Sequence, residues 1–163
     1  MLIDNSLILD AAFALTTTGS STNYIDTVGA ASGQAQISGV NTIQGGNDAY
    51  KSLWWEVIVG TSFTGNGGST VDFQLWTSNV VAQIWTTGNG GSLPTASTTV
   101  PTTKLLSTGA LAYTALTAKS VLIKARLPQG CQEFVSSFYN VFGTIGAGKI
   151  TNVLVPDVDI NLT

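Results

Sequence analysis

The sequence predicts an all-β protein, an antiparallel jelly roll or β-sandwich with an extended N-terminal segment. Three observations support this fold class. Short runs of β-branched and aromatic residues alternate with polar residues, clusters of Gly, Asn, Ser and Thr separate these runs, and helical periodicity is almost absent. About eight runs follow one another at a spacing of roughly 8–15 residues, which is typical of an antiparallel sandwich.

The first half of the chain contains the most regular strands. Residues 21–28 are expected to form an early strand. In Lys51–Val59, the residues Leu53, Trp55, Val57 and Val59 share one strand face, and in residues 71–76 Val71, Phe73 and Leu75 do so. Between the last two runs, Gly65-Asn66-Gly67-Gly68 tolerates positive φ angles. We therefore expect these two strands to form a hairpin.

The middle of the chain is less regular. Residues 80–86 are expected to form a shorter strand or an edge segment. The segment 86–103 is rich in Thr, Gly and Pro, and we expect a long surface loop because Pro cannot donate a hydrogen bond in a central strand. Ala110–Leu116 is the best helix candidate.

Two further alternating runs, residues 121–127 and 134–142, precede Gly143–Gly148. With Lys149, this Gly-rich segment matches the phosphate-binding pattern G-x-x-x-x-G-K, but Ile150 stands where that motif needs a Ser or Thr hydroxyl. A strand pattern rather than a helix follows, so no helix N-terminus faces a phosphate. The segment is expected to be the turn of a second hairpin, with residues 149–155 as the returning strand.

The last expected strand covers residues 158–162. Val158, Ile160 and Leu162 share one face of this strand, and Asp157 and Asp159 lie on the other face. Two carboxylates are too few for calcium, which needs about six oxygen ligands. The acidic face is therefore expected to be solvated.

Composition excludes several kinds of chemistry. The chain has no His and a single Cys, Cys131, so it lacks Ser-His-Asp triads, imidazole metal ligands and Cys clusters. Charged residues make up 9% of the chain, and its six basic residues are too few to neutralise many phosphates. No run of 18 apolar residues is present. We expect no enzyme activity, no cofactor, no metal, no nucleic acid and no membrane.

Four Trp residues at positions 54, 55, 76 and 85 allow three interpretations. Trp54 and Trp55 are adjacent, so they point to opposite faces of one strand. An outward Trp is typical of a protein interface or a ligand surface, and an inward one of a core. Core packing, a protein contact and a sugar-stacking platform of Trp54, Trp76 or Trp85 all remain open.

Several segments together carry a resemblance to a known family: Ile3-Asp4 in a short open N-terminus, Ser21–Asp26, Thr70–Leu75 and Gly148–Thr151. Through them, residues 2 to 160 resemble the capsid cement (decoration) proteins of tailed bacteriophages. The loop 86–103 is longer than the resemblance leads us to expect. The resemblance implies a jelly-roll homodimer at two-fold positions on the outer capsid surface of the virion, made in the bacterial host cytoplasm. It implies the major capsid protein as partner, fastened without covalent links.

We expect two parts in the chain. Residues 1–12 are expected to form an N-terminal arm, and residues 13–163 a single jelly-roll-like domain. The arm would add a strand to a partner's sheet; pairing inside its own sandwich is the alternative. The expected partner contacts are Leu2, Ile3, Asp4, Leu7, Ile8, Leu9, Trp54 and Trp76. The competing functions are a carbohydrate-binding module or fibre-type domain, and a hydrolase with a carboxylate pair that no residue pattern identifies.

Overall fold

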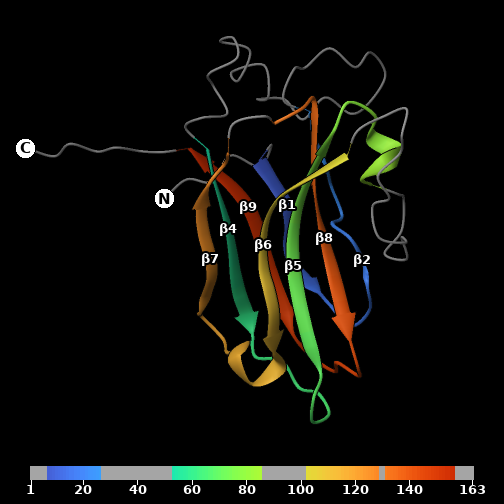
Figure 1. The fold of residues 1–163 in the computed structure, drawn as a ribbon. Helices are drawn as coiled ribbons and strands as arrows, with labels where there is room; N and C mark the ends of the chain where they lie inside the picture. Colours follow the sequence, from blue (N-terminus) through green and yellow to red (C-terminus); the bar gives the residue numbers. More distant parts are fainter. Residues whose placement is uncertain (1–6, 27–52, 86–101, 129–130, 157–163) are drawn as a thin grey trace, which may run out of the picture.

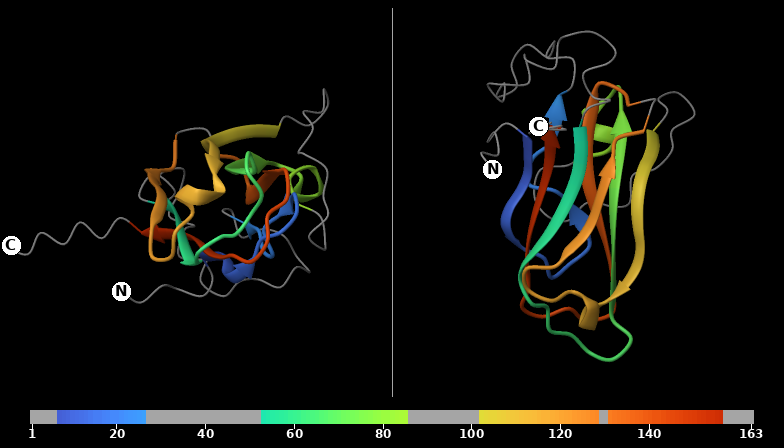
Figure 2. Two further views of the ribbon diagram at one scale, coloured as in Figure 1. Left: turned by 90° about the horizontal axis from the view of Figure 1, so that it is seen from below. Right: turned by 90° about the vertical axis from the view of Figure 1, so that its left-hand side faces the viewer.

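The computed structural model describes residues 7–26, 53–85, 102–128 and 131–156, which form two antiparallel β-sheets packed against each other (Figures 1 and 2). The expected all-β sandwich is confirmed. The first sheet has the strand order β1-β9-β4-β7, and the second has the order β2-β8-β5-β6, with β3 also paired to β8. The strands are β1 (Ile8–Ala14), β2 (Gly19–Ser20), β3 (Ile25–Asp26), β4 (Leu53–Thr61), β5 (Thr70–Ser78), β6 (Thr102–Ala112), β7 (Val121–Arg126), β8 (Phe134–Phe142) and β9 (Lys149–Pro156).

The strand order is that of a jelly roll. Strands pair in a nested way along the chain, β5 with β6, β4 with β7, β2 with β8 and β1 with β9, and every pair is antiparallel. Apart from β2–β3 and β5–β6, each strand is followed by a strand of the other sheet. This is the arrangement of two Greek keys rolled into a sandwich.

Both expected hairpins are wrong, although their strands are present. β4 and β5 lie in different sheets, and so do β8 and β9, so residues 62–69 and 143–148 cross from one sheet to the other. The two crossing segments pair with each other instead. Thr64 N–H donates to the Ala147 carbonyl at 2.8 Å, and Gly146 N–H donates to the Thr64 carbonyl at 2.7 Å.

Gly143 allows the second crossing segment to approach the first. Its φ of 79° lies in the region that glycine adopts without strain. A Cβ on Gly143 would lie 2.7 Å from the Ser69 hydroxyl oxygen. That hydroxyl donates to the Thr144 carbonyl and accepts from the Thr144 N–H, at 2.9 and 3.1 Å. Residues 143–148 thus pack against the other crossing segment of the same chain, residues 62–69.

Three expectations for the middle of the chain are corrected. Residues 81–83 form the 3-10 helix η4 (Val81–Gln83), where a strand was expected. Ala110–Leu116 is not a helix: its first residues end β6, and the 3-10 helix η5 (Tyr113–Ala115) follows. β6 begins at Thr102 within the expected loop 86–103; residues 86–101 of that loop lie outside the described residues. Within the described ranges, no helix is long and apolar enough to cross a membrane.

The N-terminal strand belongs to the sandwich. β1 pairs with β9 of the same chain, which is the alternative to an arm over residues 8–12. Two register shifts interrupt this pairing, between Ile8 and Asp10 and between Asp10 and Phe13. Ala12 has a φ of 48°. Residues 1–6 of the expected arm lie outside the described residues.

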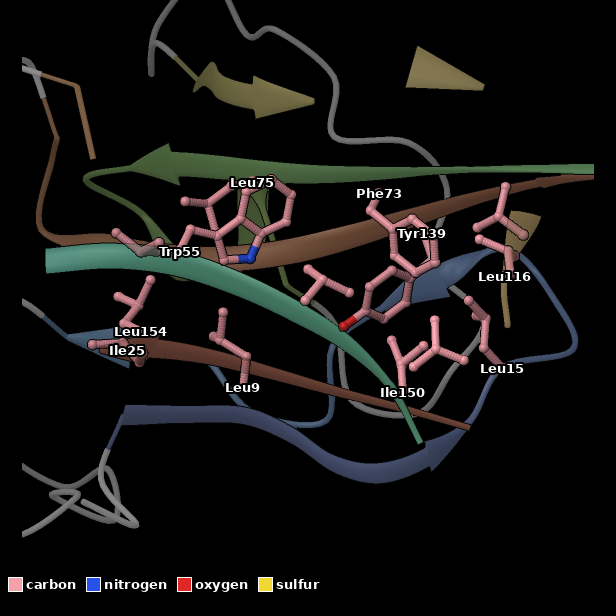
Figure 3. Packing of buried hydrophobic residues seen from close by; sticks show 14 of the residues in the cluster. Leu9, Leu15, Ile25, Trp55, Phe73, Leu75, Leu116, Tyr139, Ile150 and Leu154 are labelled. Atoms are coloured by element: carbon pink, nitrogen blue, oxygen red, sulfur yellow. The ribbon is translucent and has the colours of Figure 1, made fainter. Parts of the chain in front are cut away.

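The core lies between the two sheets (Figure 3). Three of the largest fully buried side chains belong to this core: Trp55 of β4, Phe73 of β5 and Tyr139 of β8. Phe73 contacts the Tyr139 ring edge-on at 5.7 Å. Burial of each such side chain contributes about 1.5–3 kcal/mol to stability. On each of β4, β5 and β8, every second residue therefore points into the core.

Candidate interaction surfaces

The two aromatic residues expected to contact partners lie on opposite outer faces of the sandwich. Trp55 is buried in the core, so its neighbour Trp54 points outward from the first sheet. Trp76 follows the inward Leu75 and points outward from the second sheet. Both are half-buried. The expected opposition of Trp54 and Trp55 is confirmed.

On the outer face of the first sheet, two cross-strand pairs of side chains connect β4 and β7. The Arg126 guanidinium lies 5.5 Å from the centre of the Trp54 ring, a cation–π distance. One step along the same face, Lys124 Nζ lies 4.0 Å from Oε2 of Glu56. Glu56 is only 7% exposed, whereas the Lys124 side chain is 57% exposed. The basic groups therefore form the accessible part of this face.

On the outer face of the second sheet, the side chains around Trp76 are joined by hydrogen bonds. The Trp76 indole N–H donates to Oε1 of Gln74 at 2.9 Å, and Nε2 of Gln74 donates to Oδ2 of Asp72 at 2.6 Å. Ser107 of β6 donates to the other Asp72 oxygen at 2.7 Å. These bonds fix the orientation of the indole and hold a polar strip across β5 and β6.

Phe142 is a surface residue that the sequence reasoning did not single out. It ends β8 and is 73% exposed, the largest value among the exposed large apolar residues. Phe134 and Phe138 share its strand face, yet both are buried. The position of Phe142 next to Gly143, at the end of the alternating run, was the only signal in the sequence.

The third candidate Trp for sugar stacking packs within the protein. The Trp85 ring contacts the Tyr24 ring at 5.1 Å, and Tyr24 contacts Phe134 edge-on at 5.8 Å. The Trp85 indole N–H donates to the Ser21 carbonyl at 2.8 Å. Since Trp54 lies on the opposite face from Trp76, the three candidate residues do not form one platform.

The remaining expected partner contacts fall into three groups. Leu7 and Leu9 are buried in the core, so they are not available to a partner in this structure. Ile8 is half-buried and lies opposite Val153 of β9. Leu2, Ile3 and Asp4 lie outside the described residues, as do Asp157 and Asp159.

A chain of buried polar groups joins the two sheets inside the core. Trp55 Nε1 donates to Oδ1 of Asn152 at 2.7 Å, and Asn152 Nδ2 donates to the Tyr139 oxygen at 2.7 Å. Figure 3 shows the Tyr139 hydroxyl directed from β8 toward the first sheet. That hydroxyl donates to Oδ2 of Asp10. The Thr22 N–H and hydroxyl both donate to Oδ1 of Asp10 at 2.7 Å.

Burial determines the pKa values of the two acidic groups in this network, Asp10 and Tyr139. It raises the pKa of Asp10 above its ordinary value, although hydrogen bonds from Tyr139 and Thr22 act in the opposite direction. Burial and the neighbouring carboxylate hold the pKa of Tyr139 well above its ordinary range. Asp10, Tyr139 and Asn152 are fully buried, so these groups tie the sheets together rather than face a substrate.

Cys131 has the properties of a packing residue. Burial raises the pKa of its thiol to about 11, against the effect of a hydrogen bond with Thr77. The thiol is therefore protonated near neutral pH and is a poor nucleophile. In the described residues, no three His, Cys, Asp or Glu side chains gather to hold a metal ion.

Comparison of the sequence with known proteins assigns the chain to no family. No family model matches the chain. No curated protein matches it in sequence either.

Proposed function

We propose that this protein binds the outside of a tailed-phage capsid, fastens neighbouring major capsid subunits without covalent links and thereby stabilises the shell. One observation carries the proposal: a single rigid sandwich presents aromatic side chains outward on both faces. Trp54 lies on the first sheet, and Trp76 and Phe142 lie on the second. The resemblance of the sequence to cement proteins supplies the partner, the major capsid protein, and the location on the virion.

Aromatic side chains suit this role because they supply large contact area at a low cost in side-chain entropy. Residues that dominate protein interfaces are enriched in Trp and Tyr and sit at the centre of the contact. Phe142, at 73% exposed, has most of its ring available for burial by a partner. The hydrogen bonds of Trp76 hold its indole in place before binding, which reduces the ordering cost.

A protein with two contact faces gains strength from their combination. A copy of this chain that touches one capsid subunit holds its second face close to the next subunit, so the second contact is effectively intramolecular. A homodimer at a two-fold position doubles the number of contacts. Such a protein remains soluble alone, because each contact is weak, and binds firmly once the shell exists.

The proposal is tested by mixing the purified protein with empty shells. We expect the wild type to sediment with the shells and to raise the temperature at which they fall apart. Phe142→Ala and Trp54→Ala are each expected to weaken attachment by about tenfold or more, as truncation of a central aromatic does. The matched control is Val80→Ala, which shortens a residue that is 38% exposed and lies beyond the end of β5.

Absence of wild-type attachment to shells, or equal attachment of all three variants, would contradict the proposal. Circular dichroism and thermal unfolding of each variant establish that a loss of attachment does not come from unfolding.

A further inference from the structure

One lateral side of the sandwich is formed by the two edge strands β6 and β7, and Figure 2 (right) looks onto it. We call it the β6–β7 side. Among the described residues, no strand pairs with the outer edge of either strand. Several apolar residues here are only partly buried although they pack against the core: Leu105, Leu106, Leu111, Leu122 and Ile123. The core is therefore incompletely covered on this side.

Positive charge is concentrated on the same side. Four of the six basic residues lie on β6, β7 and their connection: Lys104, Lys119, Lys124 and Arg126. Residues 102–126 contain no carboxylate. The buried Glu56 of β4 is the acidic partner of Lys124. A strand added here by a partner would meet apolar residues on its inner face and cations on its outer face.

β7 is the more suitable of the two edges. Its pairing with β4 has one register shift, whereas the pairing of β6 with β5 has two, and β6 also contains Gly109 with a φ of 68°. Bulges of this kind twist an edge and discourage pairing. Val121 at the start of β7 is 52% exposed. The outward Lys124 and Arg126 would repel a second β7, so direct pairing of two β7 edges is disfavoured.

The sequence after β9 has the pattern that this edge requires. Residues 157–162 read Asp-Val-Asp-Ile-Asn-Leu and lie outside the described residues. As a strand they would place Asp157, Asp159 and Asn161 on one face and three apolar residues on the other. The two carboxylates have the same two-residue spacing as Lys124 and Arg126. Six residues also match the length of β7.

We propose that residues 157–162 of a second copy of this chain add a strand to the outer edge of β7. Asp157 and Asp159 then face Lys124 and Arg126, and the apolar residues cover the half-buried leucines of the β6–β7 side. When both copies exchange this segment, the contact is closed and two-fold, as in a swapped dimer. The inference rests on the homodimer of the proposed function and states how that dimer forms.

The chain's own segment is too short for this position. β9 ends at Pro156, level with Leu53 at the start of β4, and the new strand would lie beyond β7. That position is three strand spacings away, about 14 Å in total, which uses about four extended residues. Asp157 and Asp159 would then lie in the connecting segment and could not pair with β7. A second copy is under no such constraint.

The first experiment measures self-association of the purified protein by sedimentation at increasing concentration. We expect the full chain to dimerise and the chain ending at Pro156 to remain monomeric. Lys124→Glu/Arg126→Glu and Asp157→Lys/Asp159→Lys should each weaken the dimer by roughly tenfold or more, because cross-strand attraction becomes repulsion. Lys149→Glu reverses a single charge at the start of β9, away from the β7 edge, and should leave the dimer unchanged.

The decisive measurement mixes the two reversed variants. The reversed edge of one copy complements the reversed segment of the other, so the mixture should form dimers that neither variant forms alone. Restoration of this kind also shows that both variants are folded. A monomeric wild type, a full dimer from the chain ending at Pro156, or a mixture that stays monomeric would each overturn the inference. These measurements use no capsid, so a failure of shell attachment would remove only the proposed function.

Discussion

On one lateral side of the sandwich, formed by β1, β2 and residues 21–23, hydrogen bonds join the two sheets, whereas on the β6–β7 side the two edge strands belong to different sheets and do not pair with each other. Asn23 N–H donates to the Leu9 carbonyl of β1 at 3.0 Å, and Ser21 N–H donates to the Ser137 carbonyl of β8 at 2.9 Å. We call this the β1–β2 side.

If the proposed dimer forms, the two sides divide stability from binding. The β1–β2 side contains Asp10 and Thr22, whose hydrogen bonds are directed inward and satisfied within the chain. The β6–β7 side contains cations and half-buried leucines, which a second copy would cover in the proposed dimer. A side that is sealed internally contributes to folding, and a side that is left incomplete is available for association.

The largest expected difference between the sides comes from shortening one leucine on each. Leu9→Ala removes a side chain that is 0% exposed and should lower the free energy of unfolding by about 2–5 kcal/mol. Leu106→Ala removes a half-buried side chain from β6 and should cost about 1 kcal/mol, since part of that side chain already contacts water. Urea unfolding of the two variants gives both values. Equal costs would contradict the comparison.

A smaller effect is expected from the buried hydroxyl that joins the sheets. Tyr139→Phe leaves Oδ2 of Asp10 without its donor and Nδ2 of Asn152 without its acceptor, and should cost about 2–3 kcal/mol. Tyr24→Phe is the matched control, because the buried Tyr24 hydroxyl has no hydrogen-bond partner among the described residues. That variant should be as stable as the wild type or slightly more stable. A Tyr139→Phe protein of unchanged stability would contradict the role of this group.

The carboxylate of the β1–β2 side should also give the protein a pH dependence. Burial raises the pKa of Asp10, so the folded state binds its proton more readily than the unfolded state. The stability contributed by protonated Asp10 is complete below the ordinary pKa of 3.8 and is lost as the pH rises through the folded pKa. Relative to Asp10→Asn, the wild type should therefore gain stability on acidification in that window. Urea unfolding at a series of pH values measures it; a difference that shrinks on acidification would contradict the sign.

The smallest effect is a difference in local opening, measured by hydrogen exchange without any substitution. Amides of β9, paired on both sides, should exchange slowly, and amides on the outer edge of β7 should exchange faster. If the β7 edge is covered in a dimer, its exchange slows as the protein concentration rises. Equal protection of β7 and β9 at low concentration would contradict an open edge.

Local alternation in the sequence predicted strands well but could not predict which strands pair. The runs over residues 51–59, 71–76 and 134–142 all became strands, and the opposite faces of Trp54 and Trp55 follow from the two-residue period. The Gly-rich segments 65–68 and 143–148 indicated turns, but a turn residue permits a sheet crossing as readily as a hairpin. The partner of each crossing segment lies about 80 residues away in the sequence. A local pattern of turn residues carries no information on such a distant contact.

The missed strands have irregular pairing. In β1, register shifts on both sides of Asp10 interrupt the two-residue period, and a charged residue in an apolar run indicated exposure. In β6, Gly109 and two register shifts have the same effect. Of the expected contacts, Trp54 and Trp76 are outward, whereas Leu7 and Leu9, two residues apart and so on one face, are buried in the core. Exposure of Phe142 depends on how far its neighbours extend, which sequence alone does not specify.

The place of β9 has a consequence for how the molecule is made. β9 lies between β1 and β4, and it is the only described strand that pairs with β1. The first sheet therefore cannot assemble on the ribosome until residues 149–156 have emerged, more than a hundred residues after β1 was synthesised. Until then β1 and β4 have no strand between them, and their unpaired edges and apolar faces are exposed to aggregation.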